Sequence, residues 1–165
     1  MANNCSEYEM SLIQKLDTFT KQTINRTKPT DFSFLCGPPF CSGAYHHGHY
    51  LNMTMKDVIL RNRTMEGLNA PRRMGYDTMG LPIEMIIQKK FSLNNADDIE
   101  AFGIDRFREE CSKFVDDNIG NWNEIIPRMG ISLELDNPYL TKSRDYQSTE
   151  WSVFKTMWDK GLIYK

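Results

Sequence analysis

The first half of the chain predicts a strand, a glycine-containing loop, a helix and a second strand, an order that few folds contain. Residues 32–36 are apolar and aromatic and predict a short strand, which Gly37-Pro38-Pro39 ends. A glycine-containing loop follows over residues 40–48, and residues 49–65 predict a helix. Residues 69–76 predict a second strand. Because such a crossover is right-handed and makes its two strands parallel, this order indicates an α/β fold.

The remaining sequence predicts helices around this unit. Apolar residues recur at helical spacing in four segments: 5–22, 83–91, 94–130 and 147–160. Gly67 and Gly161 are placed to end the helices before them. A turn is expected over residues 136–138, and residues 162–164 resemble the start of a strand. The tryptophans and Phe154 are expected to lie in the core.

Composition narrows the classes of protein to which the chain can belong. With 165 residues, 40% of them hydrophobic and 25% charged, the chain can form one domain with a core. Its net charge of −2 argues against a freestanding nucleic-acid binder, so RNA contacts would come from a local patch or another part of a larger protein. The sequence has no secretory signal and no apolar run of 18 residues, so we expect a cytoplasmic protein without a membrane partner.

All three histidines, His46, His47 and His49, lie within four residues of one loop. Gly43 and Gly48 lack a Cβ atom, so their backbone can approach a ligand closely. The helix that follows presents free N–H groups and a positive dipole end to an anion. Because His46 and His49 are three residues apart, the first turn can direct both rings toward one point. Two imidazole donors at this position suit a phosphoryl group that gains charge during its reaction.

Two other interpretations of this loop stay open. The histidines can be accidental, or they can bind zinc together with Cys36 and Cys41. A zinc site requires a third and fourth ligand within tetrahedral reach, and the spacing of these cysteines matches no zinc pattern. Cys5 and Cys111 add no CxxC motif. Nucleotide binding is therefore the favoured interpretation, and no metal ligands or structural zinc are expected.

Residues 46–49, His-His-Gly-His, resemble the H-x-G-H signature of class I aminoacyl-tRNA synthetases. Isoleucyl enzymes carry runs similar to several others in this chain, so the resemblance extends from the first helix to the last residue. It is strongest to the eukaryote-type cytoplasmic isoleucyl enzymes. The similar runs are Gly37-Pro38-Pro39-Phe40, Met55-Lys56-Asp57-Val58-Ile59, Arg72-Arg73-Met74-Gly75-Tyr76-Asp77, Gly80-Leu81-Pro82-Ile83-Glu84 and the stretch from Phe154 to Tyr164.

The resemblance implies a fold and an activity. The fold would be the first half of a Rossmann-like, HUP-type nucleotide-binding fold with additional helices, an incomplete α/β domain. Residues 1–30 would be an N-terminal helix and linker, and residues 31–165 the first half of the catalytic domain, ending before the editing insertion. The implied activity is that of an isoleucine-tRNA ligase, which activates isoleucine with ATP and Mg²⁺ and transfers it to tRNA(Ile) through domains absent from this sequence. DNA is not an expected partner.

The resemblance also implies roles for ATP-binding residues. His46 and His49 would be catalytic, contacting the ATP phosphates and stabilising the pentacoordinate α-phosphate. Gly43 and Gly48 would join them in the ATP-binding site, with Gly48 letting adenine approach the backbone.

For the amino acid, Pro39 and Phe40 would shape the pocket, and Asp77 would hold the substrate α-ammonium group. The alternative for Asp77 is a solvated turn residue. Lys56 and Asp57 are interpreted as an ordinary pair on a helix face.

The sequence also departs from the family. Met79 stands where the family usually has histidine, Cys36 where an acidic residue is usual, and no K-M-S-K-S-like run occurs. Met79 and the missing lysine run favour a second hypothesis, a catalytically inactive remnant that acts as an ATP- or partner-binding module. The intact His-His-Gly-His run, Asp77 and the strand-like C-terminal residues favour the first hypothesis, a segment of a normal ligase. A nucleotidylyltransferase would require a complete small domain, which the resemblance through residue 164 argues against.

Overall fold

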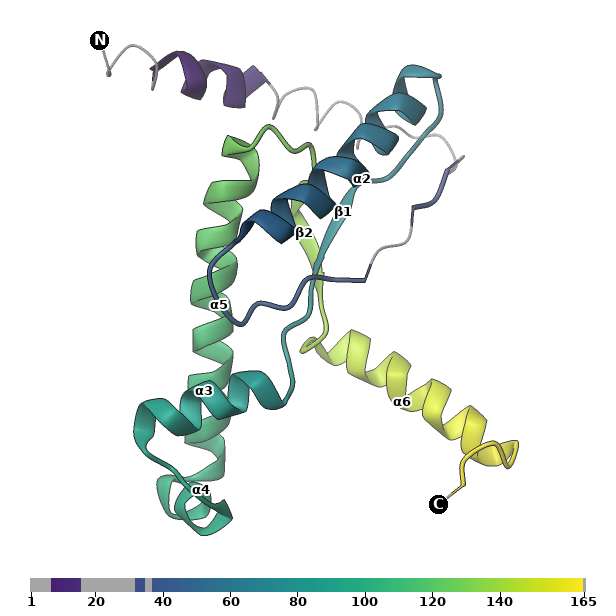
Figure 1. Cartoon of the computed structure of the whole chain (residues 1–165). Coiled ribbons are helices and arrows are strands. Elements are labelled where there is room, and N and C mark those ends of the chain that lie inside the picture. Colours follow the sequence, from purple (N-terminus) through teal and green to yellow (C-terminus); the bar gives the residue numbers. More distant parts are fainter. Residues whose placement is uncertain (1–6, 16–31, 35–36, 165) are drawn as a thin grey trace.

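The computed structural model describes residues 7–15, 32–34 and 37–164 (Figure 1). Residues 7–15 are helical, in agreement with that part of the predicted helix over 5–22; the rest of that helix lies outside the described residues. The named elements follow in chain order: α2 His47–Met65, β1 Arg73–Tyr76, α3 Leu81–Phe91, α4 Ala96–Phe102, α5 Ile104–Arg128, β2 Glu134–Leu140 and α6 Arg144–Asp159. No helix among these residues is long and apolar enough to cross a membrane.

The strands β1 and β2 form a two-stranded parallel sheet. Just past the end of β1, Asp77 also makes an isolated parallel bridge to Phe40, so three segments run in the same direction. The parallel order predicted for the strand–helix–strand unit is therefore confirmed at this bridge. The helices α3 to α5 connect β1 to β2, as a parallel connection requires.

The helices α2 and α5 cover the same face of the sheet. Met74 and Tyr76 are two residues apart on β1, so their side chains point to one face. They share a buried cluster with Met53 of α2 and with Trp122 of α5. Val115, Trp122 and Ile126 lie on one side of α5, and all are at most 1% exposed. This apolar stripe follows the helical repeat, which is why the sequence predicted the helix correctly.

Glycines set two of the helix boundaries. The predicted helix over 94–130 is divided at Gly103, whose φ of +98° separates α4 from α5. Gly67 follows α2 with a φ of +89°, a conformation that favours glycine, as the sequence predicted for this helix end.

Asp57 on α2 is a buried anchor, and its interpretation as an ordinary helix-face residue was wrong. Its Oδ1 accepts the backbone N–H of Ser132 at 3.1 Å, and its Oδ2 accepts Arg61 Nε at 2.6 Å. The guanidinium of Arg72, with a side chain 0% exposed, lies 3.7 Å from Oδ1. One carboxylate thus joins α2 to the segments that lead into β1 and β2.

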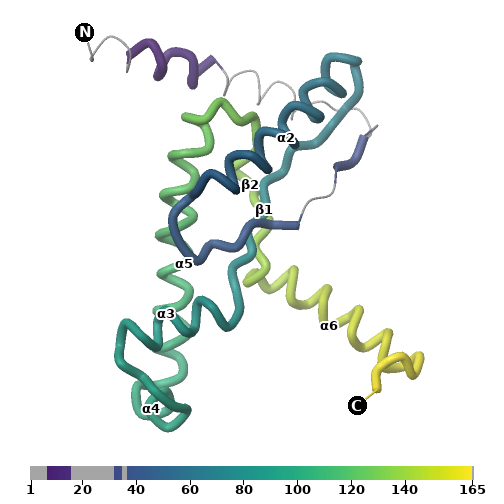
Figure 2. Tube along the Cα trace, viewed as in Figure 1, coloured from purple at the N-terminus to yellow at the C-terminus, as the bar shows by residue number. Residues whose placement is uncertain are grey.

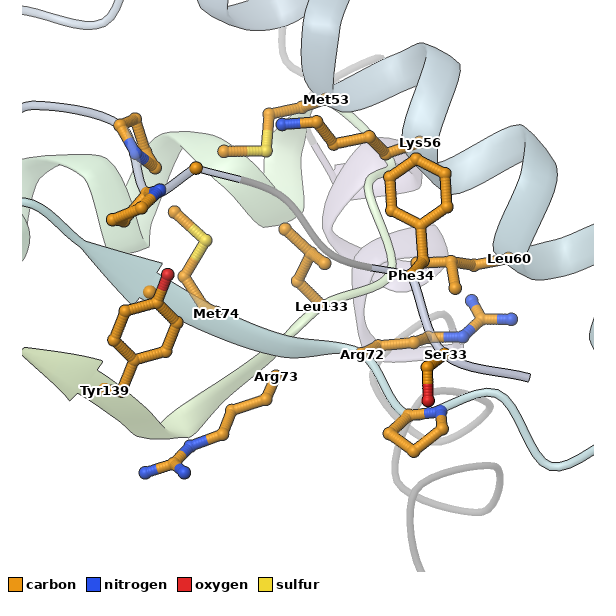
Figure 3. A pocket seen from close by; sticks show the side chains of 15 residues that line it. Ser33, Phe34, Met53, Lys56, Leu60, Arg72, Arg73, Met74, Leu133 and Tyr139 are labelled. Atoms are coloured by element: carbon orange, nitrogen blue, oxygen red, sulfur yellow. The ribbon is translucent and has the colours of Figure 1, made fainter. Parts of the chain in front are cut away.

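The predicted strand over 32–36 does not form in residues 32–34, and residues 35–36 lie outside the described part. Pro38 and Pro39 lack the amide hydrogen that a ladder with β1 needs, so the pairing begins at Phe40. A cavity of about 450 Å³ lies between residues 33–34 and 37–39, α2 and β1 (Figure 3). The second strand begins at Arg73 instead of residue 69, after Pro71.

The turn predicted over residues 136–138 was also wrong, because these residues lie within β2. They form an irregularity in the ladder: Arg73 pairs with Glu134, but Gly75 pairs with Tyr139. Two steps along β1 therefore match five along β2, and the extra residues bulge outward. The Arg73 guanidinium holds the bulge by donating to the backbone oxygen of Asn137 at 2.8 Å.

The C-terminal helix α6 differs most from expectation. Trp151, Phe154 and Trp158 were expected in the core, yet they are 67%, 46% and 64% exposed. The helix extends away from the rest of the molecule (Figures 1 and 2). Its periodicity predicted an apolar face correctly but carried no information about what that face contacts. Gly161 ends α6 as predicted, and residues 162–164 form no strand.

Candidate active site

The loop of residues 40–48 meets the carboxyl end of β1 through a pair of backbone hydrogen bonds. Asp77 N–H donates to the Pro39 oxygen at 2.9 Å, and Cys41 N–H donates to the Asp77 oxygen at 3.1 Å. Pro39, Phe40 and Asp77, which the sequence assigned to one amino-acid site, are thus adjacent in space. In open parallel sheets this edge is where ligands bind.

Two side chains of α5 hold the same loop from the other side. Asn118 Nδ2 donates to the Cys41 oxygen, and Trp122 Nε1 donates to the Gly43 oxygen, each at 2.9 Å. These bonds satisfy loop carbonyl groups that a strand or helix would otherwise pair. Sequence reasoning missed both residues as parts of the site. Their spacing of four on a helix with an apolar face was the available signal, but nothing local linked them to a loop 77 residues away.

The two histidines of the signature stack against each other at the start of α2. His46 is the N-cap, with extended backbone at φ −128° and ψ 170°. Its N–H donates to His49 Nδ1 at 3.3 Å, and the ring centroids lie 3.7 Å apart. The spacing predicted that the two rings lie on one side, and they do. Because Nδ1 of His49 accepts a hydrogen bond, the hydrogen of the neutral ring resides on Nε2 and is available to a ligand.

His49 is further packed by aromatic rings. The Trp122 ring centroid lies 4.6 Å away and that of Tyr45 lies 5.2 Å away. Burial, and secondarily the neighbouring His46, lowers the pKa of His49 below its usual value of 6.5. The ring is therefore neutral at pH 7, where it can donate a hydrogen bond without carrying a charge. His47, in contrast, is exposed.

The two glycines assigned to nucleotide binding differ in their surroundings. A Cβ atom on Gly48 would lie 3.1 Å from Cε1 of His46, so glycine leaves room for the His46 ring. A Cβ atom on Gly43 would meet nothing within 4 Å, and its carbonyl group is the acceptor for Trp122.

Cys41, the second residue of the loop, is fully buried. Burial, reinforced by the nearby Asp77 charge, raises the pKa of its thiol to about 12. The thiol donates to the Pro39 oxygen at 3.9 Å. It is therefore protonated at neutral pH and unsuited to act as a nucleophile. No group of three potential metal ligands occurs within the described ranges, and Cys36 lies outside them.

Asp77 is half-buried immediately after β1. Its Oδ1 lies 3.5 Å from the hydroxyl of Thr141, which follows β2. Lys142, the next residue, directs its ammonium group to Asp116 at 2.6 Å and to Ser112 at 2.8 Å on α5. The carboxyl ends of β1 and β2 therefore meet at Asp77. The side chain of Lys142 is bound by residues of α5.

The cavity described above lies beside this region but not over the histidines. Its lining includes Pro39 from the predicted amino-acid residues and Lys56 from α2. The rest of the lining is largely apolar: Phe34, Met53, Leu60, Met74 and Leu133 surround it (Figure 3).

The sequence matches the model of class I tRNA synthetases for isoleucine, leucine, methionine and valine over residues 10–165. The chain belongs to this family.

Relatives within the synthetase family include isoleucine–tRNA ligases. The Treponema denticola enzyme is 39% identical over 92% of this chain. The cytoplasmic enzymes of Saccharomyces cerevisiae and Schizosaccharomyces pombe are 38% and 36% identical over 96% and 100% of it. The chain spans only 14–16% of the length of these relatives.

A solved synthetase structure has the same fold. It is the ternary complex of Agrobacterium radiobacter K84 agnB2 LeuRS with tRNA and LeuAMS, which matches 94% of this chain with a TM-score of 0.71 and 26% identity. The chain covers 18% of that protein. The α/β, Rossmann-like fold expected from the sequence is confirmed.

Met79 stands where the sequence resemblance predicts a histidine. Its side chain is 40% exposed, and its sulfur accepts Gln147 Nε2 of α6 at 3.2 Å. A thioether is a weak acceptor and no donor, so this position cannot supply the hydrogen bond that an imidazole would.

Proposed function

We propose that this chain is a segment of an isoleucine–tRNA ligase that binds ATP and isoleucine. Relatives of that name align over 92–100% of the chain, which supports isoleucine as the substrate. The observation that carries the proposal is the stacked pair of His46 and His49 at the start of α2. Their spacing of three residues alone would bring the rings together, so the support comes from their place beside the ligand edge of a parallel sheet.

The proposed reaction begins with attack of an isoleucine carboxylate oxygen on the ATP α-phosphorus. A P–O bond forms to isoleucine, the bond to the β-phosphate breaks, and pyrophosphate leaves with the electron pair. No protein nucleophile takes part, in keeping with the inert thiol of Cys41. Catalysis then rests on positioning and on stabilising charge. Mg²⁺ accompanies ATP as part of the substrate, and the tRNA 3′ end takes the acyl group in a second step.

His46 and His49 are the proposed catalytic residues. The Nε2–H of neutral His49 and the ring of His46 would donate to phosphate oxygens as negative charge builds up in the transition state. The free N–H groups of the first turn of α2 add a positive dipole end to the same region. Gly43 and Gly48 would complete the ATP site by letting the nucleotide approach the backbone.

The amino-acid end of the site would lie at the backbone pairing of the loop with β1. Asp77 is proposed to bind the α-ammonium group of isoleucine, and Pro39 and Phe40 to border its side chain. The Asp77 carboxylate is half-buried, where an ion pair is stronger than in open water. The solvated-turn alternative predicts instead that removing this carboxylate leaves amino-acid affinity unchanged.

The proposal extends to organisation and partners. Residues 31–165 would be the first half of the catalytic domain, following an N-terminal helix and linker over residues 1–30. The tRNA would be bound by other parts of a longer protein, since the chain has a net charge of −2. A cytoplasmic location is proposed from the yeast relatives, both of which are named cytoplasmic.

The second candidate is a catalytically inactive remnant that binds ATP or a partner protein. One feature favours it. Met79, where the sequence resemblance predicts a histidine, carries a side chain that cannot donate a hydrogen bond. This candidate predicts ATP binding without amino-acid-dependent chemistry.

The test combines calorimetric binding of ATP and isoleucine with isoleucine-dependent ATP–pyrophosphate exchange. Wild type is compared with a His46→Ala/His49→Ala variant and with His47→Ala, whose exposed side chain is a matched control. Saturable binding of both substrates that the double variant loses and His47→Ala keeps supports the proposal. Exchange with isoleucine would show that the segment is itself a catalyst. ATP binding without isoleucine binding supports the remnant, and binding of neither substrate refutes both for the isolated chain.

A further inference from the structure

Two buried threonines join the carboxyl ends of the strands next to Asp77. Thr78 and Thr141 are 4% and 8% exposed. Thr78 N–H donates to Thr141 Oγ1 at 2.9 Å, and the two hydroxyl oxygens lie 3.0 Å apart. Lys142 N–H donates to Thr78 Oγ1 at 2.9 Å, and Thr141 Oγ1 lies 3.5 Å from Asp77 Oδ1. These four residues form one continuous chain of contacts.

Counting hydrogens fixes the direction of this chain. A hydroxyl has one hydrogen to donate, and a carboxylate oxygen can only accept. The contact with Asp77 therefore uses the hydrogen of Thr141. Thr141 then has none left for Thr78, so the Thr78 hydroxyl is the donor in the 3.0 Å contact. Its oxygen accepts from Lys142 N–H, and every donor in the chain points toward Asp77.

From this geometry we propose that Thr141, supported by Thr78, is a positioning residue that orients the Asp77 carboxylate toward the ammonium group of the substrate amino acid. This rests on the proposed role of Asp77 in binding isoleucine. The hydroxyl on Oδ1 restrains rotation of the carboxylate and leaves Oδ2 for the ligand. Bonds that share one direction polarise one another and strengthen the last of them. That last contact, at 3.5 Å, is the longest in the chain.

The ammonium group of Lys142, the residue after Thr141, is bound by residues other than Asp77. The Lys142 ammonium group is bound by Asp116 at 2.6 Å and by Ser112 at 2.8 Å, both on α5. Its backbone N–H supports the threonine chain while its side chain is held elsewhere. The negative charge of Asp77 is thereby kept for a cationic group that arrives with the ligand.

The test is calorimetric titration of the 165-residue chain with L-isoleucine and with 3-methylpentanoate, which is isoleucine without its amino group. Thr141→Val should weaken isoleucine binding about tenfold, on the order of one hydrogen bond to a charged group. Thr141→Ser, which keeps the hydroxyl, should stay within about twofold of wild type. Binding of 3-methylpentanoate should not change in either variant, because it has no ammonium group for Asp77 to hold.

The matched control is Thr54→Val. The buried Thr54 hydroxyl has no hydrogen-bond partner among the described residues, so the same substitution there should not change isoleucine binding. The proposal is overturned if Thr141→Val binds isoleucine like wild type. It is also overturned if isoleucine and 3-methylpentanoate weaken equally, because that result indicates general damage to the pocket.

An NMR measurement separates failure of the threonine chain from failure of the proposed function. In Thr141→Val and in Asp77→Ala, the amide proton of Lys142 should move upfield as its hydrogen bond weakens; in Thr54→Val it should not. An unchanged Lys142 amide in Asp77→Ala refutes the directed chain. If the wild type binds no isoleucine while the Lys142 amide responds as expected, the amino-acid role of Asp77 is refuted. The positioning role of Thr141 is then refuted with it, but the directed threonine chain is not.

Discussion

Replacing Asp57 by alanine tests whether the buried carboxylate on α2 holds the crossover together. Its side chain is 9% exposed and faces the Arg72 guanidinium, which is 0% exposed, at 3.7 Å. Removing one member of a buried ion pair typically costs about 3–5 kcal/mol, because the other charge stays buried without compensation. The backbone N–H of Ser132 loses its acceptor as well. We expect the free energy of unfolding to fall by about 3–5 kcal/mol, and the melting temperature by roughly 6–20 °C.

The assay is urea unfolding at pH 7, followed by circular dichroism. Asp117→Ala, an exposed position on α5, is the matched control and should change stability by no more than about 0.5 kcal/mol. Adding Arg72→Met to Asp57→Ala should cost less than the sum of the two separate changes, because each single change already removes the interaction between the two side chains. A loss below about 1 kcal/mol for Asp57→Ala, or additive costs within about 0.5 kcal/mol, would refute this reasoning.

Three further predictions concern pH, packing and the exposed helix. The pKa of His49 is lowered from 6.5 in the folded state, so the unfolded chain binds the proton more tightly. The contribution of His49 to stability is therefore fully present above pH 6.5 and is lost as the pH falls below it. Melting temperatures at pH 7.5 and 5.5 should differ less in His49→Gln than in wild type, and an equal difference contradicts the prediction. A Cβ atom on Gly75 would lie 2.1 Å from the Tyr139 ring, so Gly75→Ala should lower the free energy of unfolding in urea by about 1–3 kcal/mol. Adding Tyr139→Ala should remove that loss. A loss that persists in the double variant would show that the clash involves another residue. Exposure of Trp151 and Trp158 on α6 should cause concentration-dependent self-association in sedimentation velocity, which a Trp151→Gln/Trp158→Gln variant should reduce; a monomeric wild type at high concentration would contradict this.

Local patterns predicted the elements whose signals lie within a few residues of sequence. The apolar stripe of α5 and the glycines after α2 and α6 gave helices and helix ends close to those observed. The three-residue spacing of His46 and His49 predicted that their rings lie together, because a helix places such residues on one side. The parallel direction followed from the intervening helix, because two neighbouring strands joined by a helical crossover run the same way.

Errors arose where long-range contacts outweighed a local signal. Residues 136–138 carry a strong turn signal, but pairing with β1 and the donation from Arg73 to Asn137 hold them in a bulged strand. Residues 32–34 read as a strand from composition, but a strand requires a paired neighbour along its length. Asp57 looked like a surface residue beside Lys56, since nothing nearby in sequence indicates that Arg72 and Ser132 enclose it.

The sequence by itself determined the family, the order of elements and the positions of the histidines and of Asp77, because each is written in neighbouring residues. The tertiary structure alone decided what supports them. Asn118 and Trp122 reach the loop across 77 and 79 residues, and Thr141 reaches Asp77 across 64. It also decided that the apolar face of α6 is exposed. The periodicity of a helix or strand shows which of its sides is apolar. Which other element packs against that side depends on the packing of segments that are distant in sequence.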